Sequence, residues 1–224
     1  MGNVKPVIAV TGTRREGMVL ARAGVEVIAG GGDSAKLARE LAARAPTAAG
    51  LVSFGMAGAI DRALRLGDWV VGKRLIGPHP AECDRAWANA LLERLPGARF
   101  GAVQANGQLL SDPYDKEQLS HKSAALVVDM ESHIVAQAAQ AAGVPFAILR
   151  CVSDTAGAVL PPAVEVMMKP DGDLDVGAVL GSLARRPGQF GHFVHTLAGF
   201  NRAYRSLIKG ASQAGERLAF DARG

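Results

Sequence analysis

Short apolar runs alternate along the chain with longer segments in which apolar residues recur every three or four positions. Apolar runs of about four to eight residues bounded by glycine or proline predict strands, and recurrence at helical spacing predicts helices. The predicted strands cover residues 6–10, 25–30, 50–60, 68–76, 125–130 and 144–152. The predicted helices cover residues 33–45, 81–95, about 131–142 and a tail that begins near 176.

Strands that alternate with helices are typical of a layered α/β domain with a largely parallel sheet. No repeat, low-complexity tract or long linker divides the 224 residues, which are enough for one substantial core. We therefore expect a single domain over residues 1–224. Within it, we expect the proline- and glycine-rich stretch 157–175 to be irregular and residues 176–210 to be helical.

Two acidic residues follow predicted strands in the mostly apolar stretch "VVDMESHIVAQAAQAAGVPFAILRCVSDTA", residues 127–156. A strand–helix–strand crossover joins parallel neighbours in one sheet, so Glu131 and Asp154 are expected at one sheet edge, where open α/β sheets bind ligands. There an ionised Glu131 would accept hydrogen bonds from paired sugar hydroxyls, and a partly desolvated Asp154 would hold a proton for a leaving group. A structural alternative stays open, because acids at these positions also stabilise helix and turn starts.

Composition limits the compartment and the partners. Cys83 and Cys151 are too few for a disulfide framework, and no apolar run has the length of a signal peptide or a membrane span, so we expect a cytoplasmic protein. A net charge of +4 is compatible with phosphate or an anionic membrane, but the 5% aromatic content and scattered basic residues argue against nucleic acid. The histidines and cysteines show no metal-ligand spacing, and no cofactor is expected.

Three motifs resemble one known superfamily. Residues 127–156 are similar to the signature of the nucleoside phosphorylase and methylthioadenosine/adenosylhomocysteine nucleosidase superfamily, and "SFGMAGAIDRALRLGDWVV" (53–71) is similar to its glycine-rich turn. The amino-terminal strand-to-glycine turn also fits, so the resemblance covers residues from about 7 to 156. It implies a three-layer α/β/α phosphorylase/hydrolase-like fold with a mixed, largely parallel central sheet.

Within that superfamily, "VDMESH", "LPPA", "KPDGDLD" and "SLARRPGQ" resemble the hopanoid-associated phosphorylases, also called adenosylhopane nucleosidases. This likeness implies removal of adenine from adenosylhopane in hopanoid biosynthesis, by a homodimer or larger assembly. An ordinary purine nucleoside phosphorylase, a methylthioadenosine/adenosylhomocysteine nucleosidase and a non-catalytic nucleoside sensor remain alternatives, as does a purely structural module.

The resemblance also implies a role for individual residues. Asp154, preceded by Ser153, would protonate or hydrogen-bond N7 of the purine while the C1′–N9 bond breaks. Glu131 would hold the 2′- and 3′-hydroxyls, and Met130 would pack on the sugar face. Leu109 and Leu110 would meet the base edge through backbone groups.

The nucleophile is expected to be inorganic phosphate rather than water. Glycine-rich turns and arginines bind phosphate, which points to Gly12, Arg14, Arg15, Gly55 and Met56. The resemblance places a water-activating carboxylate in the first turn of the hydrolases, whereas this chain has Gly17 at the aligned position. Glu16, one residue earlier, remains an alternative catalytic base. A solvated loop is the structural alternative for the two arginines.

The tail "PGQFGHFVHTLAGFNRAYRSLIKG" (187–210) combines apolar residues near helical spacing with interspersed arginines and a lysine. One interpretation is a terminal helix packed on the sheet or in a subunit contact. The other is an interfacial helix that makes a peripheral membrane contact and receives a lipid-tailed nucleoside. The second interpretation predicts weaker liposome binding for a Phe193→Ser, Phe200→Ser variant.

Overall fold

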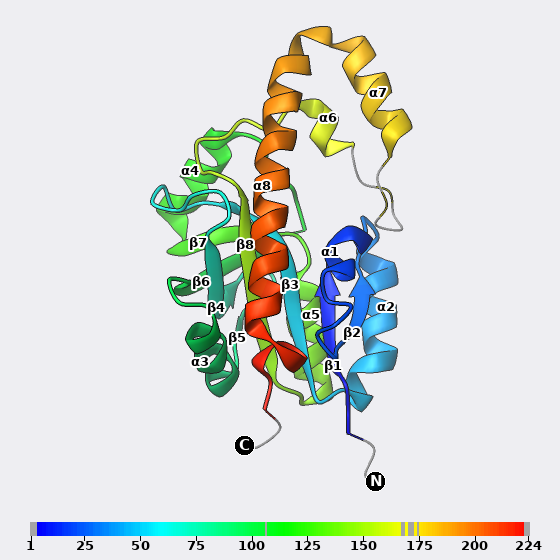
Figure 1. The fold of residues 1–224 in the computed structure, drawn as a ribbon, viewed down its shortest axis with the longest axis vertical. Coiled ribbons are helices and arrows are strands. Elements are labelled where there is room, and N and C mark those ends of the chain that lie inside the picture. Colours follow the sequence, from blue (N-terminus) through cyan, green and yellow to red (C-terminus); the bar gives the residue numbers. More distant parts are fainter. Residues whose placement is uncertain (1–3, 106, 167–168, 170–172, 174, 222–224) are drawn as a thin grey trace.

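The computed structural model describes residues 4–105, 107–166, 169, 173 and 175–221 (Figure 1). Its strands are β1 Val7–Thr11, β2 Glu26–Ala29, β3 Gly50–Ala59, β4 Trp69–Ile76, β5 Ala81–Glu82, β6 Arg99–Ala105, β7 Ala125–Asp129 and β8 Phe146–Asp154. Its α-helices are α1 Arg14–Met18, α2 Ser34–Arg44, α3 Arg85–Arg94, α4 Pro113–Lys122, α5 Ser132–Ala142, α6 Pro162–Glu165, α7 Val176–Arg185 and α8 Phe190–Ala214.

Local signals placed most of these elements correctly. All six predicted strands form, and α2 begins after Asp33, whose side chain accepts a hydrogen bond from the Lys36 amide. Helix α5 ends at Gly143, which adopts the left-handed conformation (φ 65°) that favours glycine. The prediction of a helix from residue 81 was wrong at its start, because Ala81–Glu82 form β5 and the cap at Asp84 begins α3 at Arg85. The elements α1, β6 and α4 were not predicted, nor was the short helix α6 inside the stretch 157–175 that was expected to be irregular.

One mixed sheet of eight strands organises the fold. Pairing is parallel in β1–β2, β1–β3, β3–β8, β4–β6 and β6–β7, and antiparallel in β3–β7, β4–β5 and β4–β8. The strands β3, β7, β6, β4 and β8 therefore pair in a closed ring, and β2, β1 and β5 extend it. The predicted mixed, largely parallel sheet is confirmed.

Glu131 and Asp154 were predicted to lie at one sheet edge because their strands would be parallel neighbours, and this prediction of the strand pairing was wrong. The strands β7 and β8 are not parallel neighbours; β3 pairs with both, antiparallel to β7 and parallel to β8. A bulge near the end of β3 lets Gly58 pair with Val128 on β7 and with Asp154 on β8. Both acidic strand ends therefore converge on residues 56–58, although their strands run in opposite directions.

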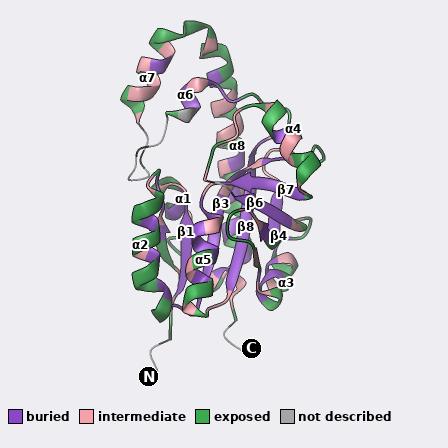
Figure 2. Cartoon of the chain, turned by 180° about the vertical axis from the view of Figure 1, so that it is seen from behind, coloured by how far each residue is buried: buried purple, intermediate pink, exposed green. Residues whose placement is uncertain are grey.

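Helices cover both faces of the sheet. Helices α2 and α5 pack on one side, and α3 and the carboxyl-terminal half of α8 pack on the other (Figures 1 and 2). The strands are mostly buried, and every residue of β1 and β8 is buried. Among the described residues, no helix is long and apolar enough to cross a membrane.

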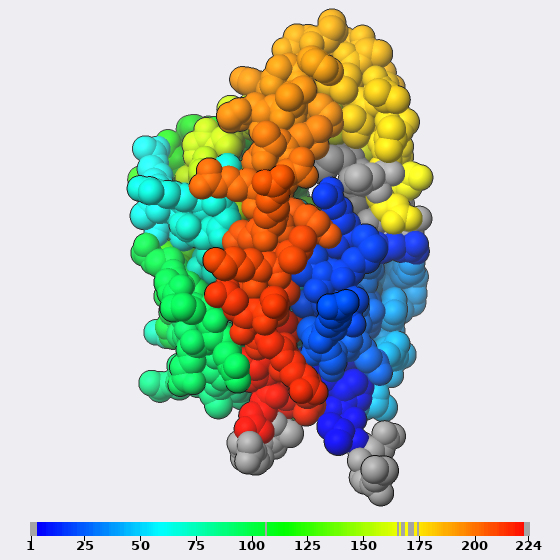
Figure 3. Space-filling model, in the orientation of Figure 1, coloured from blue at the N-terminus to red at the C-terminus, as the bar shows by residue number. Residues whose placement is uncertain are grey.

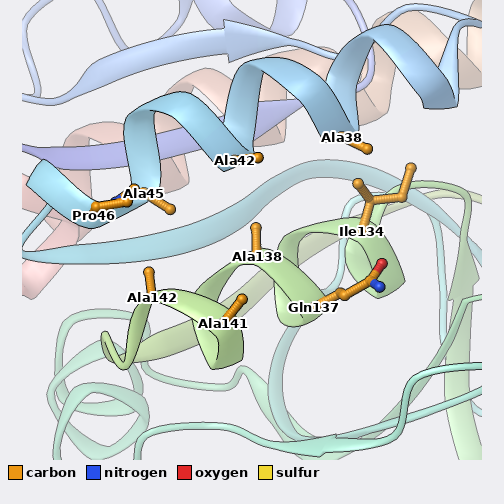
Figure 4. A pocket seen from close by; sticks show the side chains of 9 residues that line it. All are labelled: Ala38, Ala42, Ala45, Pro46, Ile134, Gln137, Ala138, Ala141 and Ala142. Carbon is orange, nitrogen blue, oxygen red and sulfur yellow. The ribbon is translucent and has the colours of Figure 1, made fainter.

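A shallow groove runs between α2 and α5, where Ala38, Ala42, Ala138 and Ala142 face one another (Figure 4). Small side chains let the two helices approach but leave space along the seam. Its lining residues include no titratable side chain, so this groove offers no group for acid–base or nucleophilic catalysis.

Candidate active site

A mostly apolar cavity lies where the carboxyl ends of β1, β7 and β8 meet the bend in β3. Helix α8 and the segment after β8 cover it through Phe200, Leu160 and Val164. Most of the residues predicted to form a site line this cavity: Gly12, Glu16, Met56, Leu109, Leu110, Met130, Glu131, Ser153 and Asp154. The sequence therefore located the cavity, while the roles of these residues stay predictions.

Glu16 points into the cavity and is held by both of its carboxylate oxygens. Oε1 accepts a hydrogen bond from the Met56 amide at 2.7 Å, and Oε2 accepts from the Thr13 amide at 2.7 Å. The Thr13–Glu16 contact is a capping box that starts α1. Gly55 has φ 142°, and a Cβ there would lie 2.7 Å from Oε1. This turn therefore requires glycine, and it fixes Glu16 as a carboxylate aimed at the ligand space.

Glu131 lies in the same cavity, beside Gly12, and is buried among charges. Burial raises the pKa of Glu131 to about 8; the Arg150 guanidinium opposes this rise, and the carboxylates of Asp129 and Glu16 add to it. This raised pKa favours the protonated form of Glu131 over the ionised form that the sequence analysis expects. In the protonated form, its carboxyl group both donates and accepts a hydrogen bond.

A buried arginine beneath the cavity was not predicted. Arg150, in the middle of β8, is 1% exposed, and its Nε donates to Asp129 Oδ2 at 2.8 Å. Its Nη2 donates to the hydroxyl groups of Ser53 and Ser132. Asp129 also accepts from the Ser132 amide at 2.9 Å, so the ion pair is satisfied on both sides. The signal was a single charge inside the apolar run "FAILRCV", which strands rarely bury unless it is paired.

Arg150 also lies close to the Gly55 turn that binds Glu16. Its Nη1 lies 3.1 Å from the position that a Cβ would take at Gly55, on the same turn that binds Glu16. Nη2 lies 3.9 Å from Glu131 Oε2. The guanidinium therefore lies near the Glu131 carboxyl group and opposes the rise of its pKa.

Asp154 is held at the other end of the cavity. The Ser153 hydroxyl donates to Oδ1 at 2.6 Å, and the Lys116 ammonium forms an ion pair with Oδ2. Lys116, on α4, is 1% exposed and also donates to the Thr155 carbonyl at 3.0 Å. Both oxygens of Asp154 thus accept hydrogen bonds from buried side chains, and its predicted role as a proton donor stays a prediction. Nothing in the sequence of α4 singled out Lys116.

The two arginines predicted to bind phosphate lie outside the cavity lining. The Arg15 guanidinium stacks on Tyr204 of α8, 4.2 Å from the ring centroid, and the Tyr204 hydroxyl donates to the Arg15 carbonyl. Arg14 forms an exposed ion pair with Asp173 at 3.5 Å. Because both side chains are directed away by the start of α1, phosphate binding by this pair has no support in the geometry.

Known structures share this fold. S-Adenosylhomocysteine nucleosidase from Streptococcus pyogenes, in complex with 5-methylthiotubericidin, superposes with a TM-score of 0.63 at 20% identity and covers 94% of this chain and 97% of that chain. The Neisseria meningitidis 5′-methylthioadenosine/S-adenosylhomocysteine nucleosidase, in complex with methylthio-immucillin-A, gives 0.59 at 17% identity, with 92% and 99% covered. A futalosine hydrolase mutant from Helicobacter pylori gives 0.57 at 19%, with 66% and 89% covered.

At these identities the likeness to solved structures is a likeness of fold. No curated protein sequence matches the chain. The family assignment comes instead from the sequence profile of the Phosphorylase superfamily, which matches residues 1–169, the part of the chain that builds the sheet and most of the cavity. The chain therefore belongs to the Phosphorylase superfamily.

Proposed function

We propose that the protein cleaves the N-glycosidic bond of an adenine nucleoside and releases adenine. The observation that carries this proposal is one apolar cavity with a Ser153–Asp154 pair at one end and the carboxyl groups of Glu16 and Glu131 at the other. Such a cavity can bind a base and a sugar and can act on the bond between them. Membership in the Phosphorylase superfamily and the adenine-nucleoside analogues bound by fold neighbours agree with this proposal.

At the base end, Asp154 would hydrogen-bond N7 as electron density moves into the purine. General acid assistance of this kind contributes ~10²–10⁴-fold to the rate. At the sugar end, Glu131 would bind the ribose hydroxyls, and Met130 would pack on the sugar face. The carboxylate of Glu16 would stabilise the positive charge that develops at C1′, and the low dielectric of an apolar cavity strengthens this effect.

Water is the nucleophile that the site favours, in contrast to the expectation from the sequence. The nucleophile space is bordered by Glu16 and Glu131, and a phosphate dianion there would be repelled by the carboxylate of Glu16. Arg150, the nearby cation, is already bonded to Asp129, Ser53 and Ser132. A carboxylate fixed by the Met56 and Thr13 amides is well placed to take a proton from water.

The cover of the cavity supports an apolar 5′-substituent. Phe200, Leu160 and Val164 line it, and among the described residues no charged side chain lines the cavity on that side. The resemblance to hopanoid-associated enzymes makes adenosylhopane our first candidate substrate. The thioether groups of methylthioadenosine and adenosylhomocysteine are the second, because fold neighbours are nucleosidases for those compounds.

Adenine release from matched 5′-substituted adenosines, measured with and without phosphate, tests this proposal. We expect release from adenosines with apolar 5′-groups, a free sugar as the second product, and no dependence on phosphate. A sugar 1-phosphate product would establish phosphorolysis instead. Nucleoside binding without release from any substrate would favour the sensor alternative, and absence of binding would contradict the proposed function altogether.

A further inference from the structure

The helical hairpin of α7 and α8 has an unusual charge distribution. Residues 176–215 contain no aspartate or glutamate, and their basic residues are Arg185, Arg186, Arg202, Arg205 and Lys209. The segment thus carries +5, whereas the whole chain carries +4, so the rest of the protein has a net charge of −1. The basic excess therefore lies in α7 and α8, with Arg185 and Arg186 at the turn between them and Arg202, Arg205 and Lys209 on the half of α8 that packs on the sheet.

The same hairpin exposes large apolar side chains. Val176 and Leu180 on α7 are each 62% exposed, and Phe190 and Val194 on α8 are 61% and 49% exposed. In each helix the two residues are four positions apart, so they lie on one face. The same side of each helix continues into a packed cluster, in which Val179, Leu183, Leu197 and Phe200 contact the buried residues Leu160, Ala163, Val164 and Phe193, so the exposed residues border this packed side. Figures 1 and 3 show the hairpin projecting beyond the α/β body at the end that holds the cavity.

We infer that this hairpin docks on an anionic lipid bilayer. Apolar side chains that enter the interface and basic side chains that face acidic headgroups are the two features that bind amphipathic helices to membranes. Phe200 joins the hairpin interior to the cavity lining. Docking would hold the cavity beside the bilayer, where a lipid-tailed substrate would lie. The delivery of such a substrate rests on the proposed function, whereas membrane binding itself does not.

Flotation with phosphatidylcholine vesicles, with and without phosphatidylglycerol, tests the inference. We expect the full chain to float with the anionic vesicles only, and salt to weaken the binding. A Leu180→Ser, Phe190→Ser variant should lose most of it, while Phe100→Ser, an exposed phenylalanine on β6, should not. The Phe193→Ser, Phe200→Ser variant would disturb internal packing rather than membrane contact, because Phe193 is buried and Phe200 lines the cavity.

A matched charge pair completes the experiment. Arg185→Gln, Arg186→Gln should weaken vesicle binding, and Arg39→Gln, Arg94→Gln, on α2 and α3, should leave it unchanged. Equal flotation of the hairpin and control variants would overturn the inference, as would a Leu180→Ser, Phe190→Ser variant that changes only oligomeric state in sedimentation. Adenine release from a soluble nucleoside, measured on the same variants, reports separately on the proposed function.

A second inference concerns Lys116, and it rests on the proposed function. A fully buried ammonium is costly unless it is paired, and the pairing here is with Asp154, the group proposed to assist the leaving purine. In the hydrogen bond between them, Lys116 Nζ is the donor and Asp154 Oδ2 is the acceptor. Asp154 then needs a source for the proton that N7 takes up.

We propose that Lys116 is a positioning residue that supplies this proton through Asp154. As the C1′–N9 bond breaks and its electron pair enters the purine, Asp154 passes a proton to N7 and receives one from Lys116 Nζ. Lys116 becomes a neutral amine and is reprotonated by solvent after adenine leaves. The attacking water forms the C1′–O bond and loses its proton to Glu16, so the charges balance.

Two variants separate proton supply from simple charge. Lys116→Arg keeps the cation but does not release its proton, because arginine stays protonated in proteins. We expect its kcat to fall at least ~10-fold with KM little changed, and Lys116→Ala with added methylamine or ammonium to regain activity in proportion to the acidity of the amine. Full activity of Lys116→Arg, or no rescue of a folded Lys116→Ala, would overturn the proposal. Adenine release by the unaltered enzyme shows independently whether the proposed function holds.

Discussion

Glu131 is buried beside two other carboxyl groups, and replacing it with glutamine tests the electrostatics of the cavity directly. The Glu131→Gln variant keeps the size and shape of the side chain but cannot ionise. Arg150, 3.9 Å away, only partly offsets the desolvation of Glu131 and its repulsion from Asp129 and Glu16. Ionisation of Glu131 should therefore destabilise the folded wild-type protein. The variant should not lose stability in this way, because glutamine does not ionise.

The size of the effect follows from the pKa of Glu131. A rise from 4.5 to about 8 corresponds to on the order of 5 kcal/mol, at ~1.36 kcal/mol per pKa unit. Because the folded-state pKa is the higher one, this contribution to stability is fully present below about pH 4.5 and is lost as the pH rises to about 8. The unfolding free energy of the wild type, relative to Glu131→Gln, should fall by up to ~1.4 kcal/mol per pH unit across that range.

Urea denaturation of both proteins from about pH 5 to about pH 9 measures this difference. Subtracting the two curves removes every group that the proteins share, and Glu93→Gln, an exposed position on α3, controls for the loss of a carboxyl group in general. A difference that stays constant with pH, or that grows in favour of the wild type at high pH, would refute the reasoning. It would mean that Glu131 is ionised in the folded state at little cost.

Four further substitutions probe the site. Asp154→Asn should keep nucleoside affinity in calorimetry but lose ~10²–10⁴-fold in kcat, and unchanged turnover would remove its proposed role. Glu16→Gln should slow release of adenine in water by at least ~10-fold, whereas a phosphate-dependent rate that survives would mean that phosphate attacks. Arg150→Met should lower the free energy of unfolding by about 3–5 kcal/mol, because Asp129 loses its buried partner; urea denaturation measures this. Gly55→Ala should lower both stability and activity, since its Cβ would collide with Glu16, and wild-type values in both assays would contradict the described turn.

The sequence alone determined the elements whose signals are local. These signals depend on residues within a few positions of one another, so they can be recognised from the sequence. They include the apolar strand runs, the helix cap at Asp33 and Gly143 at the end of α5. For the same reason the sequence placed Glu131 and Asp154 at the ends of strands, whereas Glu16 was suggested as an alternative base by the family resemblance. These residues do line one cavity.

Only the tertiary structure decided how those residues meet and what charges surround them. The crossover rule predicted parallel neighbours, but β3 bends and pairs with both β7 and β8, and no local pattern encodes that bend. Lys116 and Asp154 are 38 positions apart, and Arg150 and Ser53 are 97 apart. The partner of a buried charge is chosen by packing between distant segments, because the cost of removing a charge from water is offset only where the finished fold brings an opposite charge or a hydrogen-bond partner to it.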